Sequence, residues 1–347
     1  MLILTTRWCH TETCSTMPHQ NQNQNQNPVT RNSQAKGNSG REPHIGQPQP
    51  LPYEGPLNMV TMFKYFSRRA IGGVEQVDLE NSTYRRSVRV DGQMGIIEIQ
   101  ALSDGRLEWS SSFNQSQPSE AIEARVRAIF GLDQPIVEAH QLLGSDQFLA
   151  PIVAVHSGLR VAGTWDPFET GVRTIMGQQV SVAGASTIAA RFVERLGTRM
   201  DRVGDCVDTL GADCPQYLFP TPATVAEANL DAIGMPQARV NAIRGFANAV
   251  AEGQVVLDKA VPLDELISSI CAIKGLGPWT AHYIAMRLGH HDAFPAADLG
   301  LRKALATTGD DGVSNVPNTR QLEARSEAWR PWRSLAAMLL WHHNSQP

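Results

Sequence analysis

The chain has 347 residues, of which 42% are hydrophobic and 18% are charged, and its formal net charge is -4 at pH 7. This length and hydrophobic content allow a large core and two or three domains. The negative net charge excludes a protein that is basic throughout, such as a histone, but it is compatible with a DNA enzyme that has a local basic face. The five cysteines are scattered, which argues against a disulfide framework and favours a reducing, cytoplasmic compartment. No apolar run in the sequence is long enough for a signal peptide or a membrane span.

The first segment, residues 1–50, is polar and compositionally biased, with Asn and Gln alternating over 21–27. It cannot bury enough apolar surface to offset the entropy lost on ordering, so we predict that it is disordered. Cys9, His10 and Cys14 within it resemble a fragment of a metal site. Two further ligands at a suitable spacing are missing from the sequence, which argues against that interpretation.

Residues 51–134 are predicted to form a small α+β domain with an antiparallel sheet. Two of its segments alternate polar and apolar residues, and Asp91-Gly92 between them is a hairpin signal. A later segment places Ile122, Val126 and Ile129 on one helical face. The predicted elements are a helix over 59–70, strands over 84–90, 95–100 and around 107–109, and a helix over 119–130.

Residues 135–347 are predicted to be helical throughout, with short connections rich in Gly and Pro. No repeat of 20–50 residues is visible, which argues against a solenoid. The expected helices cover 137–143, 168–176, 183–196, 224–229, 237–252, 263–272, 279–288, 299–307 and 318–342.

Two of these helices form a predicted hairpin over about 264–289, around the turn Gly275-Leu276-Gly277-Pro278. The two glycines permit positive φ and leave the backbone of the turn uncovered, and a proline suits the first turn of a helix. The turn therefore presents backbone N–H groups at a helix N-terminus, which is a phosphate site that recognises no base sequence. The same pattern also fits an ordinary tight corner between two helices.

Asp298 follows this hairpin, behind Pro295 and ahead of an apolar helical run. Its simplest role is that of a helix N-cap. A capping carboxylate is also rigid and ionised, and it suits a site at which positive charge develops during a reaction.

The sequences 275–281, Gly-Leu-Gly-Pro-Trp-Thr-Ala, and 294–298, Phe-Pro-Ala-Ala-Asp, resemble the DNA-3-methyladenine glycosylase II (AlkA-like) family of helix-hairpin-helix DNA glycosylases. Further matches are 165–182, similar to the family's first core helix and its loop, 219–222 and 233–239 in the middle, and 329–334 near the last helix. The resemblance covers most of 53–343. It implies an α+β fold: a mostly α-helical glycosylase core with the hairpin, preceded by a small antiparallel-sheet domain.

The resemblance implies hydrolysis of the N-glycosidic bond of alkylated purines, such as 3-methyladenine and 7-methylguanine, in damaged double-stranded DNA. The expected enzyme acts in base excision repair as a cytoplasmic, nucleoid-associated monomer without a cofactor. An alkylated purine is cationic and leaves as a neutral base, so one carboxylate that faces the oxocarbenium-like sugar and activates water is sufficient. We expect Asp298 to be that residue. Asp166 and Glu169 are weaker candidates because first-turn acids are explained by the helix dipole.

A cationic base is attracted to electron-rich ring faces, by roughly 0.5–2 kcal/mol for each contact. Trp279 and Tyr283 are four residues apart and share one helix face. The resemblance implies that they and Trp341 form the walls of the base pocket, with Tyr65 contributed by the first domain. Each of these aromatic residues, taken singly, also fits a position in the core. Because Trp279 stands where bifunctional relatives have a nucleophilic lysine, we expect no lyase activity.

The resemblance also implies DNA contacts and a cation. Gln179 matches the wedge that fills the gap left by a flipped base, although some family members have an apolar residue there. Lys274 stands where related proteins usually have Pro. His290 and His291 lack further ligands and are not expected to bind a metal. The expected DNA contacts are Gly275, Gly277, Thr280, Lys274, Gln178 and Gln179, and a monovalent cation is expected on the carbonyls of Cys271, Ile273 and Leu276.

Two other interpretations stay open at this point. The same fold can act on oxidised or deaminated bases, or it can form a module that binds DNA without catalysis. A panel of lesion duplexes distinguishes the first alternative from the leading one. Binding without base release, measured under single-turnover conditions, identifies the second.

Overall fold

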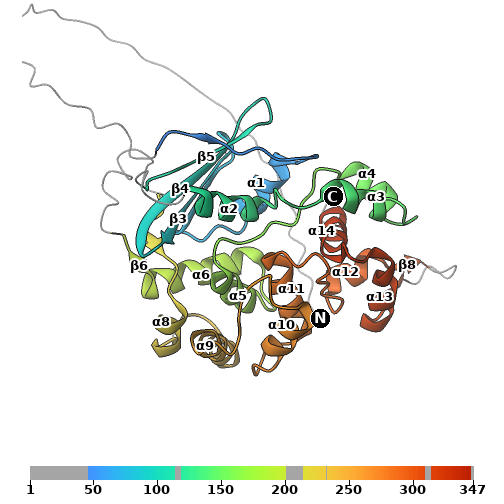
Figure 1. Ribbon diagram of the computed structural model, residues 1–347. Coiled ribbons are helices and arrows are strands. Elements are labelled where there is room, and N and C mark those ends of the chain that lie inside the picture. The colour runs from blue at the N-terminus through green and yellow to red at the C-terminus, as the bar shows by residue number, and fades with distance from the viewer. Residues whose placement is uncertain (1–45, 114–118, 201–213, 232, 309–313, 345–347) are drawn as a thin grey trace, which may run out of the picture. The chain divides into compact units, whose positions relative to one another are not determined.

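The computed structural model describes residues 46–113, 119–200, 214–231, 233–308 and 314–344 (Figure 1). All of them belong to one compact unit, Glu42–Pro347. Most of the predicted disordered segment 1–50, together with Cys9, His10 and Cys14, lies outside the described residues. The described end of that segment contains a two-residue strand, Gln49–Pro50.

The N-terminal part contains a five-stranded antiparallel sheet in the order β1-β5-β4-β3-β2. The β3–β4 hairpin pairs Val90 with Gln93, and the two residues between them, Asp91 and Gly92, have φ of 48° and 79°. Such a left-handed pair is the two-residue turn that the Asp-Gly dipeptide predicted. The strands are β1 (Gln49–Pro50), β2 (Glu75–Asp78), β3 (Thr83–Val90), β4 (Gln93–Ala101) and β5 (Leu107–Ser111).

Two helices, α1 (Met59–Ser67) and α2 (Ser119–Phe130), pack on this sheet (Figure 1). Phe66 of α1 lies with its ring centroid 5.0 Å from the centroids of both Tyr84 and Phe130. The predicted apolar face of α2 is buried. Asn58 caps α1 by accepting a hydrogen bond from the Thr61 backbone N–H at 2.9 Å. The N-terminal α+β part therefore has an apolar core of its own.

The rest of the chain is mainly helical, and its core is built around α5, which packs against α6, α9 and α11. Two short antiparallel ribbons, β6 with β7 and β8 with β9, join helices at its edges. The helices predicted before residue 310 are present, with ends that agree to within three residues. The elements are α3 (Ile136–Leu143), α4 (Ala150–Val155), α5 (Pro167–Met176), α6 (Val182–Leu196), β6 (Thr198–Arg199), β7 (Tyr217–Leu218), α8 (Pro222–Glu227), α9 (Gln237–Ala251), α10 (Leu263–Cys271), α11 (Pro278–Leu288), α12 (Leu299–Ala304), β8 (Thr307–Thr308) and β9 (Ser314–Asn315).

The prediction of one helix over 318–342 is wrong. The chain forms α13 (Thr319–Ser326), a 3₁₀ turn η1 (Glu327–Trp329) and α14 (Arg333–Asn344). Pro331 causes the break, because proline lacks the backbone N–H and forces the preceding residue, Arg330 at ψ 140°, into an extended conformation. The sequence prediction also missed α4 and β2, because the first is one and a half turns long and the second has a single apolar residue.

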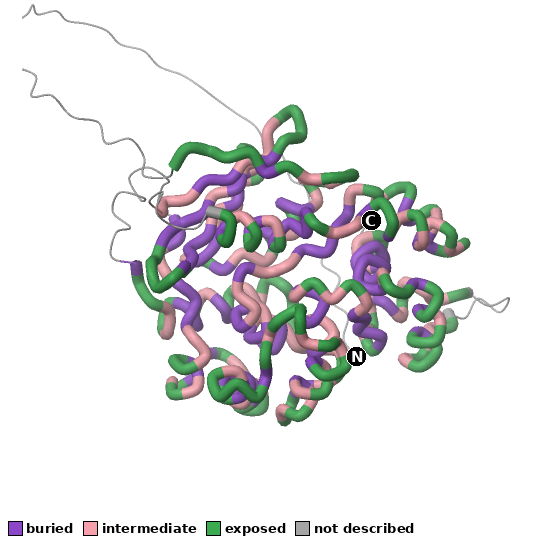
Figure 2. Tube along the Cα trace, in the orientation of Figure 1, coloured by how far each residue is buried: buried purple, intermediate pink, exposed green. Residues whose placement is uncertain are grey.

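Helix α14 is buried along most of its length, as Figure 2 shows, and it packs against α4 and α12. Across the described residues, no helix combines the length and the apolar character that crossing a membrane requires. Helices α1, α5, α11 and α14, which come from distant parts of the sequence, all contribute residues to one cavity.

Candidate active site

The predicted hairpin is formed by α10 and α11, and its turn has the expected backbone. Gly275 has φ of 93°, in the left-handed region that favours glycine. Gly277 is extended at φ -125° and precedes Pro278 at the start of α11. No side chain caps this helix, so the N–H groups of its first turn remain available to a ligand. Leu276 is buried and anchors the turn to the helical core.

Asp298 is the N-cap of α12, as predicted, and its carboxylate is held by three N–H donors. Oδ1 accepts from the Leu301 backbone and from Nε1 of Trp341, each at 2.9 Å. Oδ2 accepts from Nε1 of Trp279, also at 2.9 Å. The donors come from α12, α14 and α11, so both carboxylate oxygens have a fixed direction. Asp298 lines a cavity of about 810 Å³.

Gly300, which the sequence analysis missed, makes room for this arrangement. A Cβ atom at this position would lie 2.9 Å from Oδ1 of Asp298 and 3.5 Å from Cδ1 of Trp341. Since real Cβ atoms do not approach other atoms as closely as 2.9 Å, any larger residue would displace the carboxylate. The sequence offered only a weak signal, a glycine inside a short helical run.

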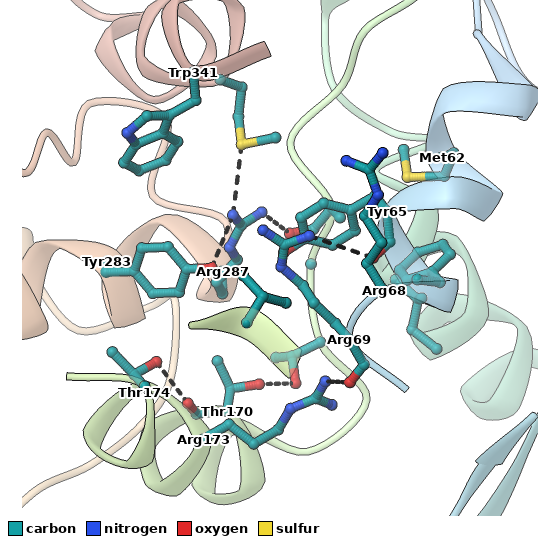
Figure 3. Close-up of a pocket in the computed structure, with 18 of the residues that line it drawn as sticks. Met62, Tyr65, Arg68, Arg69, Thr170, Arg173, Thr174, Tyr283, Arg287 and Trp341 are labelled. Carbon is teal, nitrogen blue, oxygen red and sulfur yellow. Dashed lines mark hydrogen bonds between the residues drawn. The ribbon is translucent and has the colours of Figure 1, made fainter. Parts of the chain in front are cut away.

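The predicted aromatic residues line the same cavity, and Figure 3 shows three of them, Tyr65, Tyr283 and Trp341. Trp279 and Tyr283 stack, with ring centroids 5.6 Å apart and an interplanar angle of 19°. Trp341 approaches Tyr283 at 6.0 Å between centroids. Tyr65 reaches the cavity from α1, so the α+β part supplies one wall. Asp298 and the four aromatic residues thus surround one space, although they are spread over more than 270 positions of the sequence.

The loop between α5 and α6 lies at the rim of this cavity. Gln179 is exposed and has φ of 58°. Val180, which the sequence analysis did not single out, is also exposed and lines the cavity. Gln178 is tied to the hairpin, because its Nε2 donates to Oγ1 of Thr280 at 3.0 Å and its carbonyl accepts from Arg239. Thr280 as a whole is only 2% exposed, so it supports the hairpin from within and offers little surface for a contact with DNA.

The remaining predicted positions differ in accessibility. Lys274 is exposed in the hairpin turn. The Ile273 carbonyl, one of the three expected to hold a cation with those of Cys271 and Leu276, accepts the Leu276 N–H at 3.0 Å and so has one lone pair left. Within the described ranges, no group of three or more His, Cys, Asp or Glu side chains is arranged to hold a metal ion.

Asp166 and Glu169, the weaker catalytic candidates, have structural partners. Asp166 caps α5 by accepting from the Phe168 N–H at 2.8 Å. Glu169 is 1% exposed and accepts from Arg86 at 2.7 Å and from Arg173 at 2.9 Å. These bonds explain both acids without a role in the reaction.

Tyr283 has an unusual electrostatic environment. Nη2 of the buried Arg287 donates to its hydroxyl at 3.2 Å, and the guanidinium Cζ lies 4.7 Å from its ring centroid. Burial raises the pKa of Tyr283, but Arg287 and Arg69 outweigh this effect and lower the pKa to about 7. Burial raises the pKa of the neighbouring Tyr65. Tyr283 is therefore the tyrosine of this pair that ionises first.

We expect a spectrophotometric titration at 295 nm to show one tyrosine ionising between about pH 6 and pH 8, and Tyr283→Phe to lack this step. The folded-state pKa is below the ordinary value of 10.0. Between about pH 7 and pH 10 the folded protein therefore binds fewer protons than the unfolded chain. The contribution of Tyr283 to the free energy of unfolding grows as the pH rises through this range, and it is lost as the pH falls back through 7. An unchanged titration curve in the variant would contradict the assignment.

Two family models match the chain. The AlkA N-terminal domain matches residues 49–166, and the HhH-GPD superfamily base excision DNA repair protein matches residues 172–331. The first match ends later in the chain than the predicted domain boundary at residue 134. Together the two models cover both the sheet and the hairpin.

Relatives and a solved structure agree with these matches. The chain is 34% identical over 297 residues to a Mycobacterium tuberculosis protein named probable bifunctional transcriptional activator/DNA repair enzyme AlkA, with 84% of the chain and 56% of that relative covered. It thus spans little more than half the length of this relative. It is 30% identical over 298 residues to DNA-3-methyladenine glycosylase 2 of Escherichia coli, with 84% of the chain and 96% of that protein covered.

The fold is similar to that of a 3-methyladenine DNA glycosylase from Archaeoglobus fulgidus, with a TM-score of 0.71 and 21% identity over 86% of this chain and 98% of the other. This likeness concerns the fold alone. The two domain matches and the relative in Escherichia coli give the family: the chain belongs to the DNA-3-methyladenine glycosylase II (AlkA-like) family of helix-hairpin-helix DNA glycosylases.

Proposed function

We propose that this chain is a monofunctional DNA glycosylase that hydrolyses the N-glycosidic bond of alkylated purines in double-stranded DNA, as a step of base excision repair. The observation that carries the proposal is the Asp298 carboxylate, held by the indole N–H groups of Trp279 and Trp341 at the wall of an aromatic cavity. The volume of this cavity, about 810 Å³, is in the range of small-molecule sites and accommodates a flipped purine. Family membership supports the same reaction.

The geometry supports a reaction in which the bond to the base breaks first. The electron pair of the bond between C1′ and the base nitrogen goes to the cationic base, which leaves neutral, and the sugar becomes oxocarbenium-like. Asp298 faces that positive charge with a negative one that its N–H donors already hold in place, so little reorganisation is needed during the reaction. It then accepts a proton from the water that attacks C1′. Trp279 and Trp341 hold the carboxylate in place for both roles.

The chain lacks a nucleophile suited to a lyase reaction at this position. Trp279 occupies the start of α11, beside Asp298, and an indole does not form a Schiff base with the sugar. Lys274, in the turn, is exposed and suits a phosphate contact. The DNA strand is therefore expected to stay intact after base release until alkali is added.

We place the DNA on the side of the cavity that carries the hairpin and the loop after α5. The uncapped start of α11 at Gly275 and Gly277 suits a phosphate, and the carbonyls of Cys271, Ile273 and Leu276 suit a monovalent cation beside it. Gln179, exposed at the loop tip, suits the space left by the flipped base. Thr280 and Gln178 support this surface from beneath through their mutual hydrogen bond.

The test is base release from DNA treated with a methylating agent, followed by chromatography of the free bases. Wild-type protein, acting as a monomer, is expected to release 3-methyladenine and 7-methylguanine, with affinity for DNA that falls steeply with salt. Binding without release under single-turnover conditions would overturn the proposal in favour of a non-catalytic module. Release only from duplexes with oxidised or deaminated bases would overturn it in favour of another lesion class.

Gly300→Ala is expected to slow base release by about 10- to 100-fold, because a small misplacement of a catalytic group has an effect of that size. The new Cβ would lie 2.9 Å from Oδ1 of Asp298 and would push the carboxylate aside. Alanine favours helix, so α12 itself should persist. Gly72→Ala is the matched control, because a Cβ there meets only Ala190 at 3.7 Å. Equal rates for the two variants would contradict the role of Gly300.

A further inference from the structure

The cavity carries a buried positive charge that the proposed reaction does not use. Arg287 is 4% exposed and lines the cavity two turns of α11 beyond Trp279. Its Nη1 donates to the Ala162 carbonyl at 2.9 Å, and its Nη2 donates to the Tyr283 hydroxyl at 3.2 Å and to Sδ of Met338 at 3.5 Å. Its Nε is buried and has no hydrogen-bond partner. These three hydrogen bonds use three of the five N–H groups of the guanidinium, so one on Nη1 and the buried one on Nε remain.

No carboxylate within the described residues forms an ion pair with Arg287. Its charge is stabilised mainly by the rings and hydroxyls of Tyr283 and Tyr65, whose centroids lie 4.7 and 5.2 Å from the guanidinium. Glu75 and Glu169 also line the cavity, but both are paired with Arg86 and Arg173. A buried cation without a carboxylate partner is costly in free energy, and here the hydroxyl of Tyr283, whose pKa it lowers to about 7, supplies part of the compensating negative charge.

The order of residues along α11 places this cation beside the far edge of a bound base. Trp279, Tyr283 and Arg287 are spaced by four and lie on one face of the helix. Trp279 contacts Asp298, which marks the sugar end. Helical side chains point back toward the N-terminus, so the Arg287 guanidinium lies over Tyr283, as Figure 3 shows. A purine with its sugar at Asp298 and its ring beside Tyr283 turns its opposite edge toward Arg287.

We propose that Arg287 is a specificity residue that hydrogen-bonds the carbonyl oxygen at C6 of a flipped purine, so that the pocket favours 6-oxopurines over 6-aminopurines. This inference rests on the proposed function. Guanine-type and hypoxanthine-type bases present an acceptor at that position, and adenine-type bases present an amino donor. An amino group at that position would face the N–H groups of Arg287, and two donors cannot form a hydrogen bond with each other. Charge repulsion does not produce the preference, because 7-methylguanine and 3-methyladenine are both cationic.

The experiment compares the ratio of released 7-methylguanine to released 3-methyladenine from one sample of methylated DNA. Arg287→Met removes the donors and keeps the length of the side chain, and the ratio is expected to fall about tenfold relative to wild type. Arg68→Met removes an exposed arginine that follows α1 beside the same cavity and should leave the ratio at the wild-type value. Both bases come from the same reaction, so loss of active protein cancels from the ratio.

The outcomes separate this inference from the proposed function. No release of either base by wild type would refute the function itself. Release of both bases with an unchanged or increased ratio in Arg287→Met would refute only the role of Arg287. If that variant does not fold, inhibition of the wild-type protein by free bases decides the question. Hypoxanthine is then expected to inhibit at about tenfold lower concentration than adenine, and equal inhibition would refute the inference.

Discussion

Asp298→Asn is expected to lower the rate of base release by about 10²- to 10⁴-fold, the range for loss of a positioned general base. Asparagine has nearly the same shape and still accepts the Leu301 N–H at the start of α12. It carries no charge to face the oxocarbenium-like sugar, and with its oxygen on Leu301 and Trp341 its NH₂ group faces the indole N–H of Trp279, donor to donor. The measurement is single-turnover release of 7-methylguanine, together with DNA affinity, which should be close to that of wild type.

Trp341→Phe is the matched control for this experiment. It removes one hydrogen bond to Asp298 and leaves both the carboxylate and an aromatic ring in place. A single hydrogen bond to a charged group contributes about 1.5–3 kcal/mol, so its loss should slow the reaction less than loss of the charge does. Wild-type activity in Asp298→Asn would refute the catalytic role, whatever the behaviour of the control.

Glu169→Ala is expected to lower the free energy of unfolding by about 3–5 kcal/mol, the usual effect of breaking a buried ion pair from one side. The carboxylate is 1% exposed and bonds Arg86 of β3 and Arg173 of α5. Without it, the buried Arg86 and the half-buried Arg173 would share Glu75 as their carboxylate partner among the described residues. The measurement is urea unfolding at neutral pH, which gives the midpoint and the slope.

Asp104→Ala provides the comparison, because Asp104 pairs with Arg106 on the exposed surface and should leave the midpoint unchanged. Equal midpoints for both variants would show that the buried network has no stabilising effect.

The network of Glu75, Glu169, Arg86 and Arg173 also has a geometric role. Arg173 donates to the carbonyl of Arg69, just beyond α1, so it links the helix that carries Tyr65 to α5. Loss of the network should therefore loosen one wall of the cavity.

The network also predicts acid sensitivity. Burial raises the pKa of Glu75, but Arg173 and Arg86 outweigh that effect and hold the pKa below its usual value of 4.5. A carboxyl group whose pKa is lowered by folding contributes stability that is complete above the unfolded-state value and is lost as the pH falls. This contribution should thus be complete at neutral pH and be lost as the pH falls below 4.5, through the lowered pKa of Glu75.

Local features of the fold were predictable because they depend on neighbouring residues. The Asp91-Gly92 turn, the capping position of Asp298 and the left-handed Gly275 all follow from preferences that act over a few positions. The helical period likewise located α5 and α11. Where a local signal was overlooked, as at Pro331, the predicted helix was too long.

The site itself depends on contacts between distant residues. The two indoles that hold Asp298 lie 19 and 43 positions away, and the Arg86–Glu169 bond spans 83 positions. Resemblance to a family nominated the pocket residues, but the spacing of four that puts Arg287 on the face of Trp279, and a glycine at position 300, were signals too weak to assign either residue to the site. Side-chain direction, burial and the pairing of charges are set when separate elements pack together. The sequence alone therefore determined which elements form and the family they resemble, and only the tertiary structure decided where the carboxylate points and which charges remain unpaired around it.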